Sequence, residues 1–327
     1  MKILVTGITG LLGGNIARVL LANGHKVKGL IRQTSSLKAL EGLSFEKCYG
    51  AVQNFDEVNR AMKGCDAVIH AAADTHHFTT SYLPSYQINL NGTINIINAA
   101  KENNIQRLVF ISTLNVFGNG TQSNPGDETS PFTYQLNNSC YIQSKYQAHT
   151  RVIDEVKKRG LPAIILCPSF MLGPYDSKPS SGQILLYALK HRINFVPPGG
   201  KNFVHVQDVA IAAMNSLTKG TIGEAYIVGN ENLSYRDFFD LVQEVSGYPI
   251  YQIKIPAWLL AAAGNIGESF QTTFNFNSQL TTSNMSLLST MHYYSSIKAQ
   301  KELDLPQTPV RIAVKDALDW FSTNNYI

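Results

Sequence analysis

Short apolar runs alternate with longer amphipathic stretches through the first half of the chain. The apolar runs predict buried strands, which are residues 2–7, 25–32, 66–73, 107–113 and 162–169. The stretches with helical spacing predict helices between them, which are residues 11–24, 54–64, 83–104 and 141–160. Because strand and helix follow one another in turn, the pattern predicts an α/β fold, a doubly wound parallel sheet with helices on both faces.

This alternation becomes irregular after Pro168. Loops rich in Pro, Gly and Ser follow at residues 173–182 and 196–202. We therefore predict a sheet domain, residues 1–168, and a smaller, mixed lobe, residues 169–327, some segments of which return to the first domain.

One apolar run in the second half, residues 255–264, is too short to span a bilayer. It predicts a buried or interface helix rather than stable membrane insertion. Residues 264–286 are polar and weakly patterned, and we predict no element there.

Composition places the chain among ordinary globular proteins. Of its 327 residues 44% are hydrophobic and 15% are charged, and the net charge of +4 is spread without a Lys/Arg run. So mild a charge argues against a nucleic-acid partner. The four cysteines are far apart and form no Cys-x-x-Cys pair, so we predict no metal site and a cytoplasmic location.

The strongest functional motif lies where the first predicted strand meets the first predicted helix, with the spacing G-x-x-G-x-x-G. Such glycines permit a tight turn, a close approach of backbone to pyrophosphate, and packing of helix on strand. The helix N-terminus adds free N–H groups and the positive end of its dipole. A tight turn without a ligand is the alternative. The loop residues that we predict to bind a dinucleotide are Gly7, Thr9, Gly10, Leu11, Leu12 and Gly13.

The end of the second predicted strand indicates which dinucleotide is bound. A site for NAD usually has an acid here, which holds the ribose 2′-hydroxyl. This chain has Arg32, whose guanidinium suits the 2′-phosphate of NADP(H). We predict NADP(H) in preference to NAD(H), with an ordinary surface arginine as the alternative.

A tyrosine and a lysine share one face of the last helix of the first half. Tyr141 stands four residues before Lys145, so a helix brings both side chains to the same side. The pair is either part of a solvated face or a catalytic phenol whose acidity an ammonium group sets.

Seven motifs appear in the order seen in extended short-chain dehydrogenases/reductases. They are "TGITGLLG", "DAVIHAAA", "INLNGT", "FISTLNVFG", "YIQSK", "CPSFMLGP" and "FVHVQDVA". From residue 1 to about residue 245 the chain resembles this family, and its spacing is most similar to the dihydroflavonol-reductase-like branch. The resemblance implies a Rossmann-type NAD(P)-binding domain, a substrate-binding lobe and dehydrogenase or reductase activity.

The resemblance also implies the catalytic residues. Tyr141 would be the acid/base, Lys145 its partner, and Thr113 the third group, with Ser112 as the alternative hydroxyl. A hydroxyl at a strand end that only bonds backbone is the other interpretation of Thr113. A free tyrosine has a pKa of about 10. A nearby ammonium and an oxidised nicotinamide would lower that pKa toward neutral pH.

Further cofactor contacts follow from the same resemblance. Besides Tyr141 and Lys145, the implied residues are Ala71, Ala72 and Ala73 near the adenosine ribose, and Pro168 and Ser169 along the nicotinamide. Asn89 would support the sheet edge.

One position departs from the family pattern. Members usually have an aspartate near the adenine, whereas here Gly50 is followed by Ala51. The adenine amino group would therefore lose a partner, or take Gln53 or Asn54 instead.

The histidines do not indicate a metal. His70, His76 and His77 have neither ligand spacing nor an acid companion, so we predict structural or solvated side chains. For His205 and Asp208 we predict an inter-lobe bond and a helix cap.

Four functions compete on this fold, and only site residues separate them. They are an NADP-dependent carbonyl reductase, a nucleotide-sugar epimerase, a sugar dehydratase and a non-catalytic NADP-sensing regulator. Leu114 and Asn115 stand where dehydratases carry acids, and Phe170 stands where sugar-nucleotide enzymes commonly have asparagine. Regulators of this type usually lack the Tyr–Lys pair.

We therefore predict that the chain reduces a small, largely apolar ketone or aldehyde to an alcohol. The alternatives that remain open are an epimerase first and a regulator second. Phe170 and Met171 are predicted to contact the substrate together with Thr113. Other aromatic residues would line the pocket or belong to the core, namely Tyr175, Phe195, Phe203 and Trp258. A homodimer is the predicted assembly.

Overall fold

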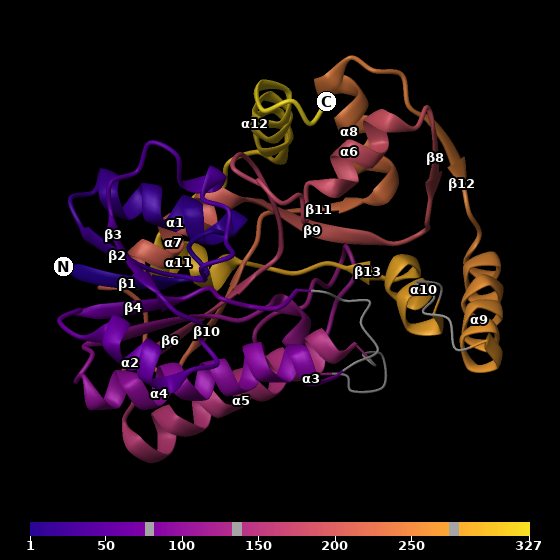
Figure 1. Ribbon diagram of the computed structural model, residues 1–327. Helices are drawn as coiled ribbons and strands as arrows, with labels where there is room; N and C mark the ends of the chain where they lie inside the picture. The colour runs from indigo at the N-terminus through magenta and orange to yellow at the C-terminus, as the bar shows by residue number, and fades with distance from the viewer. Residues whose placement is uncertain (76–81, 133–138, 275–280) are drawn as a thin grey trace.

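A seven-stranded parallel sheet forms the centre of the computed structural model, which describes residues 1–75, 82–132, 139–274 and 281–327 (Figure 1). Its strand order is β10-β6-β5-β4-β1-β2-β3, and every neighbouring pair is parallel. The strands are β1 Lys2–Thr6, β2 Lys26–Ile31, β3 Glu46–Tyr49, β4 Ala67–His70, β5 Arg107–Ile111, β6 Ala163–Pro168 and β10 Ala225–Val228. The predicted fold class is confirmed.

Helices cover both faces of this sheet (Figure 1). One face carries α1 Leu11–Ala22, α7 Val206–Asn215 and α11 Ile297–Leu303. The other carries α2 Phe55–Met62, α4 Gly92–Glu102 and α5 Cys140–Arg159. The central strands are apolar almost throughout because both of their faces are buried.

The strand order reverses beside β1. From β1 the chain moves outward to β2 and β3, and then returns to β4 on the other side of β1. The loop after β1 therefore lies at a topological switch point, the usual ligand site of such sheets. Because the strands are parallel, the segments that follow β1, β2, β4, β5 and β6 meet at one edge.

Two details of this domain differ from the sequence prediction. The sequence pattern did not predict strand β3, because this edge strand is mostly exposed and lacks an apolar run. The single helix predicted for residues 83–104 is α3 Tyr82–Ser85, a π-helical turn η2 Tyr86–Asn91 and then α4. The wider turn includes Asn89, whose buried side chain belongs to the site described below.

The second lobe has its own core around β9. Strands β7, β11 and β13 pair with β9, and β8 pairs with β12. The Phe203 and Phe238 rings stack with centroids 4.4 Å apart inside this core. The elements of the lobe are β7 Phe170–Leu172, α6 Gln183–Lys190, β8 Ile193–Val196, β9 Gly200–His205, β11 Glu231–Ser234, α8 Tyr235–Ser246, β12 Tyr251–Lys254, α9 Ala257–Phe274, α10 Thr282–Ser289, β13 Met291–His292 and α12 Val310–Thr323. The short turns η1 Lys38–Leu40 and η3 Leu114–Val116 lie in the first domain.

Helix α9 begins within the apolar run and includes its residues 257–264. Leu260 faces the protein, whereas Trp258 is 71% exposed. Of the two predicted alternatives, a buried helix is wrong for the outer face, and an interface helix stays a prediction. Among the described residues no helix has both the length and the apolar character to cross a membrane.

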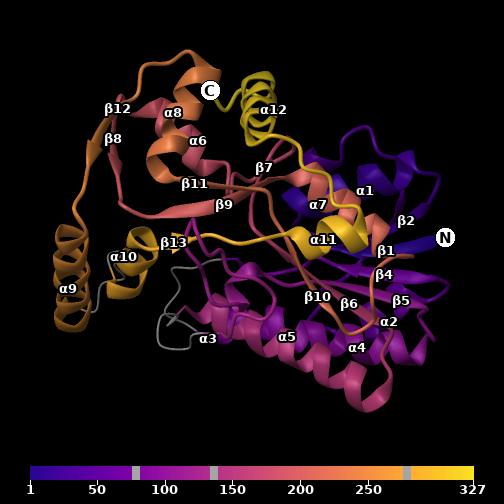
Figure 2. The ribbon, with the colours of Figure 1, turned by 180° about the vertical axis from the view of Figure 1, so that it is seen from behind.

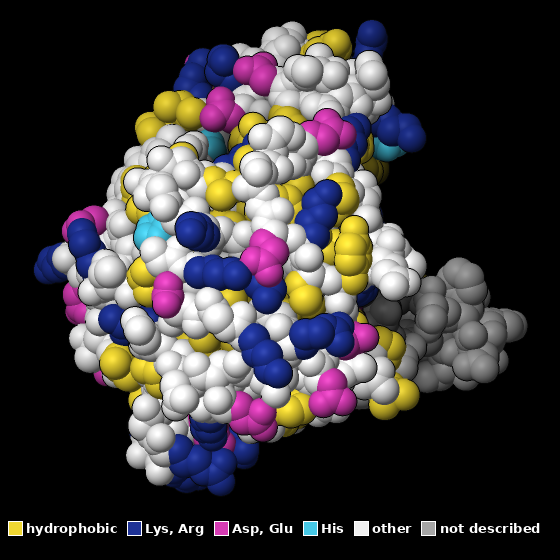
Figure 3. All heavy atoms as spheres, turned by 60° about the vertical axis from the view of Figure 1, so that its left-hand side comes forward, with side chains coloured by type: hydrophobic (Ala, Val, Ile, Leu, Met, Phe, Trp, Pro, Cys, Tyr) yellow, Lys and Arg dark blue, Asp and Glu magenta, His cyan; other side chains and the backbone are white. Residues whose placement is uncertain are grey.

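On the face drawn in Figure 3, Lys and Arg are interspersed with Asp and Glu.

Candidate active site

The glycine loop after β1 is shaped by close backbone contacts. Gly7 has a φ of +69°, and a Cβ there would lie 2.6 Å from the backbone nitrogen of Ala72. A Cβ on Gly13 would lie 2.1 Å from the carbonyl oxygen of Gly7. Both distances are shorter than any real Cβ tolerates, so the loop requires glycine at these two positions. Gly10 is different, because a Cβ there would meet only the Gly7 oxygen, at 3.3 Å.

The first turn of α1 is open to an anion. Its N-cap, Gly10, offers no side-chain bond, and no acid lies in the first turn. The N–H groups of Leu11, Leu12 and Gly13 are those that helix geometry leaves without an intrahelical partner. Together with the helix dipole they fit the pyrophosphate of a dinucleotide, and Thr9 stands half-buried just before them.

The segment after β4 packs against this loop. The Ala71 nitrogen donates to the Thr6 carbonyl oxygen at 3.2 Å, and the Ala72 nitrogen donates to the Thr6 hydroxyl at 3.3 Å. Ala73 follows, half-buried. The structure thus brings together two of the segments that the sequence assigns to the cofactor.

Arg32 lies at the same sheet edge. The β1–β2 register pairs Thr6 with Leu30, so Arg32 extends beyond β2 beside the glycine loop. Its side chain is exposed and forms no ion pair with any residue that the structure describes. A free guanidinium at this position is suited to a phosphate, although its contact with a cofactor stays a prediction.

Two adjacent hydroxyls at the end of β5 have different partners. The Ser112 hydroxyl lies 3.0 Å from Nδ1 of His149. The Thr113 hydroxyl is instead hydrogen-bonded to the Tyr141 side chain, and it accepts a bond from the Asn115 N–H at 3.3 Å. The geometry therefore favours Thr113, and not the alternative Ser112, as the group that acts beside the tyrosine.

Tyr141 and Lys145 are both buried, so they do not form a solvated helix face. Burial raises the pKa of Tyr141, and the charge of Asp74 raises it further, while the bond to Thr113 opposes the shift. Lys145 donates to the Ile111 carbonyl oxygen at 2.6 Å. Burial lowers the pKa of Lys145 to about 8. Desolvation thus outweighs the contact with Thr113, and the lowered pKa expected beside an oxidised nicotinamide stays a prediction.

A buried network, of which the sequence interpretation named only Asn89, supports the helix carrying Tyr141. Asn89 accepts from the Asp74 N–H at 2.8 Å, and donates to the Asp74 carbonyl oxygen at 3.0 Å and the Ser144 hydroxyl at 2.9 Å. Ser85 donates to the Asp74 carboxylate at 2.8 Å. Asp74 directly follows the alanine run after β4, and this place at the carboxyl edge is the signal that could have identified it.

The end of β6 contributes Pro168 and Ser169. The Ser169 hydroxyl is buried and has no hydrogen-bond partner in the described part of the chain. An orphaned hydroxyl at the ligand edge of the sheet fits a bound cofactor group. Beyond it, the Phe170 ring packs edge-on against Phe203 at 5.5 Å, and Met171 packs partly buried against the sheet core.

The other aromatic candidates fall into three settings. Phe203 belongs to the core. The centroid of the Tyr175 ring lies 3.6 Å from the guanidinium carbon of Arg18. Phe195 and Trp258 are more than half exposed at the outer edge of the second lobe. These two residues therefore belong neither to the core nor to a buried pocket.

Near Ala51, where the sequence departs from the family pattern, two polar groups already have hydrogen-bond partners. The Ala51 N–H donates to the Glu57 carboxylate at 2.7 Å. The Asn54 side chain caps α2 by accepting from the Glu57 N–H. Gln53, which is exposed, is thus the freer candidate for an adenine contact.

Two histidines noted in the sequence, His70 and His205, occupy structural positions. His70 lies between the hydroxyls of Thr6, at 2.7 Å, and Thr93, at 3.2 Å, and burial lowers its pKa to about 3. His205 both caps α7 and lies 3.2 Å from the Asp316 carboxylate. Asp208 accepts from Thr308 and is not the cap. His76 and His77 lie outside the described residues.

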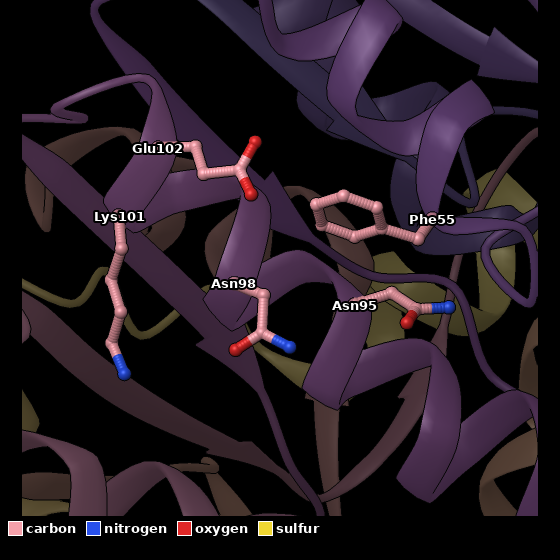
Figure 4. A pocket seen from close by; sticks show the side chains of 5 residues that line it. All are labelled: Phe55, Asn95, Asn98, Lys101 and Glu102. Carbon is pink, nitrogen blue, oxygen red and sulfur yellow. The ribbon is translucent and has the colours of Figure 1, made fainter.

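A surface pocket lies away from these groups. Figure 4 shows its lining by Phe55 of α2 and four residues of α4, namely Asn95, Asn98, Lys101 and Glu102. Lys101 pairs with Glu155, and Glu102 accepts from Asn59. None of the predicted site residues lines this pocket, so we assign it no ligand.

Residues 3–229 match the NAD dependent epimerase/dehydratase family. The chain belongs to this family. The match confirms the resemblance inferred from the seven motifs. Together with relatives named as reductases and dehydrogenases, the family match identifies this chain as an NAD(P)-dependent oxidoreductase of the extended short-chain type.

Several relatives match almost the whole chain. A protein of Synechocystis sp. that bears the provisional name of a dihydroflavonol 4-reductase is 29% identical, over 99% of this chain and 95% of its own length. Sterol demethylase protein B of Methylococcus capsulatus is 30% identical over 100% of both chains.

Solved structures agree on the fold. The crystal structure of gox2253 is 32% identical, has a TM-score of 0.89, and covers 100% of this chain and 99% of its own. The UDP-glucose 4-epimerase of Thermotoga maritima has a TM-score of 0.81 and covers 99% and 100%. At 17% identity this likeness shows the fold alone.

Proposed function

We propose that the chain is an NADP(H)-dependent reductase that converts a largely apolar ketone or aldehyde into an alcohol. The observation that carries the proposal is the hydrogen bond between the buried Thr113 and Tyr141 side chains. Two hydroxyls that share a buried site can both donate to one substrate oxygen, which is an arrangement suited to carbonyl reduction.

Each residue then has a distinct role. Thr113 donates a hydrogen bond that holds the substrate carbonyl oxygen, and Tyr141 gives its phenolic proton to that oxygen. A reduced nicotinamide would, when bound, supply the hydride for the carbonyl carbon. Lys145, fixed through Ile111, keeps a positive charge beneath the site and so stabilises the phenolate left behind.

The titration of Tyr141 suits the reductive direction. Its pKa is raised by burial, so the phenol is protonated at neutral pH and ready to act as an acid. The reverse reaction requires the phenolate and is expected to be favoured in alkaline solution.

The proposed substrate class has two supports. Phe170 and Met171 replace the polar groups of sugar-nucleotide enzymes after β6. Relatives named for apolar compounds include the sterol demethylase protein of Methylococcus capsulatus and a 3-beta-hydroxysteroid dehydrogenase of Mycolicibacterium neoaurum, which is 28% identical over 80% of this chain.

The proposed cofactor preference rests on Arg32. The pyrophosphate would be held by the glycine loop, and the nicotinamide would lie near Ser169 and Tyr141. We also propose that the protein is a cytoplasmic homodimer. Light scattering on the purified chain tests the dimeric state directly.

One panel separates this proposal from the epimerase alternative. The purified chain is incubated with NADPH and a series of steroidal, aromatic and aliphatic carbonyl compounds, beside UDP-glucose and UDP-galactose. Oxidation of NADPH by the carbonyl compounds is the expected result. Interconversion of the two sugars without net consumption of cofactor would overturn the proposal.

A further inference from the structure

The outer edge of the second lobe exposes several large apolar side chains. Figures 1 and 2 show β8, β12 and α9 at the end of the molecule farthest from the N-terminus. We call this surface the apolar edge. Its members are between 45% and 71% exposed, and they are Ile193, Phe195, Tyr251, Ile253, Trp258, Leu259 and Ile266.

The register of β8 and β12 places four of these side chains on one face. Tyr251 is paired with Ile193 across the β12–β8 ladder, and Ile253 is paired with Phe195. Cross-strand partners lie on the same face of a sheet. Strand β12 leads into α9, where Trp258 and Ile266 are two helical turns apart on one face. An exposed apolar surface of this kind marks an interaction site.

The charges of the apolar edge indicate what covers it. Residues 187–196 and 248–269 contain three Lys/Arg residues, Lys190, Arg192 and Lys254, and a single acid, Glu268. None of the three cations forms an ion pair within the described ranges. Glu268 is bonded to Thr282 of α10.

The nearest acid on the neighbouring helix is also engaged. Asp240 of α8 accepts from Gln252 of β12 at 2.6 Å and lies 3.9 Å from Arg236. With Arg236 counted, four cations and the two acids Glu268 and Asp240 leave a net charge of 4 − 2 = +2 at the apolar edge.

A second copy of the chain fits this surface poorly. A two-fold contact would bring the same three unpaired cations against themselves. An anionic lipid surface fits both properties, because its headgroups attract Lys and Arg while Trp, Tyr and aliphatic side chains enter the boundary of the acyl chains.

We propose that the apolar edge docks the protein on the surface of an anionic lipid bilayer. Trp258 and Ile266 enter the interface, and Lys190, Arg192 and Lys254 contact the headgroups. The proposal does not rest on the proposed reaction, because docking is measured without substrate or cofactor.

Vesicle sedimentation of the full chain tests the proposal. Phosphatidylglycerol/phosphatidylcholine vesicles are expected to pellet the protein, and pure phosphatidylcholine vesicles to bind it at least about tenfold more weakly. Trp258→Ser/Ile266→Ser and Arg192→Glu/Lys254→Glu are each expected to weaken binding to the anionic vesicles by at least about tenfold. All four side chains are exposed, so thermal unfolding of the variants should match the wild type.

Matched controls exclude a general effect of polarity or charge. Ile222→Ser/Ile312→Ser alters two exposed isoleucines elsewhere, and Lys157→Glu/Lys158→Glu makes the same charge change at the end of α5. Both controls should bind vesicles as the wild type does. Absence of binding to anionic vesicles, or equal loss in the controls, would overturn the proposal. A dimer that the Trp258 variant dissociates, without vesicle binding, would assign the surface to a second copy.

Discussion

The carboxyl edge of the large sheet and the apolar edge of the second lobe are built in opposite ways. At the first, polar groups are buried and bonded to one another, as Thr113 is to Tyr141 and Asn89 to Ser144. At the second, apolar groups are exposed and the cations lack ion pairs with described residues. Buried polar groups are retained at a cost in desolvation where chemistry needs them, whereas an exposed apolar surface is complete only with a partner. Changes at one edge should therefore leave the function of the other intact.

The largest effect is expected from Tyr141→Phe. The ring keeps its packing and only the proton carrier is lost, so turnover of an identified carbonyl substrate should fall by about 10²–10⁴-fold. Binding of NADPH and of anionic vesicles should be unchanged.

Tyr146→Phe is the matched control for that variant. Tyr146 lies on the same helix, where its ring stacks on Phe132 at 4.1 Å, and its loss of a hydroxyl should leave turnover near the wild-type rate. Near-wild-type turnover by Tyr141→Phe itself would remove the acid/base assignment.

The next effect separates the two hydroxyls that end β5. Thr113→Val should lower kcat by roughly 10²-fold, because it removes a donor to the substrate oxygen. Ser112→Ala should instead lower the free energy of unfolding by about 1–3 kcal/mol, because His149 loses a buried partner.

Steady-state kinetics and urea unfolding of both variants provide this comparison. If Ser112→Ala lost turnover at unchanged stability while Thr113→Val kept its rate, the roles of the two residues would be exchanged.

A smaller effect is expected at the cofactor edge. Arg32→Asp removes a charge-assisted contact with the 2′-phosphate, worth about 1.5–3 kcal/mol, so affinity for NADPH should fall by roughly 10- to 150-fold. Affinity for NADH should change little. Fluorescence titration with both cofactors measures this, with Arg236→Asp on α8 as control. Equal affinities of the wild type for the two cofactors would contradict the predicted preference.

The smallest effect is a pH dependence set by Lys145. Its pKa is lowered to about 8 by burial, so it loses its charge as the pH rises through that value. The reduction rate should fall roughly fourfold between pH 7 and 8.5. Over the interval from about 8 to its ordinary value of 10.5, the unfolded chain binds more protons than the folded chain at this group. The contribution of Lys145 to the free energy of unfolding therefore rises with pH.

The turnover rate and the contribution of Lys145 to the free energy of unfolding should thus move in opposite directions above pH 8. Turnover of the wild type, with urea unfolding of the wild type and Lys145→Met on the same buffers, tests this expectation. A rate that fell only in parallel with stability would assign the decline to unfolding and not to the site.

Local sequence was sufficient to predict the sheet domain and its glycine loop. Strand and helix there are specified by apolar runs and spacing, and Gly7 and Gly13 are needed where the chain contacts itself within a few residues. The sequence pattern did not predict strand β3, because an exposed edge strand has no apolar run. It did not predict η2, because a widened turn does not change the helical spacing of apolar residues.

The sequence by itself also determined the family and predicted Thr113, Tyr141 and Lys145 as site residues, because family motifs are properties of order and spacing along the chain. Only the tertiary structure decided which hydroxyl lies beside Tyr141, how burial shifts its pKa, and that Asp74 joins the site. It also decided that the apolar run of α9 remains outside the core. The burial of a side chain and its hydrogen-bond partners depend on residues far apart in the chain that meet only after folding, so no local pattern encodes them.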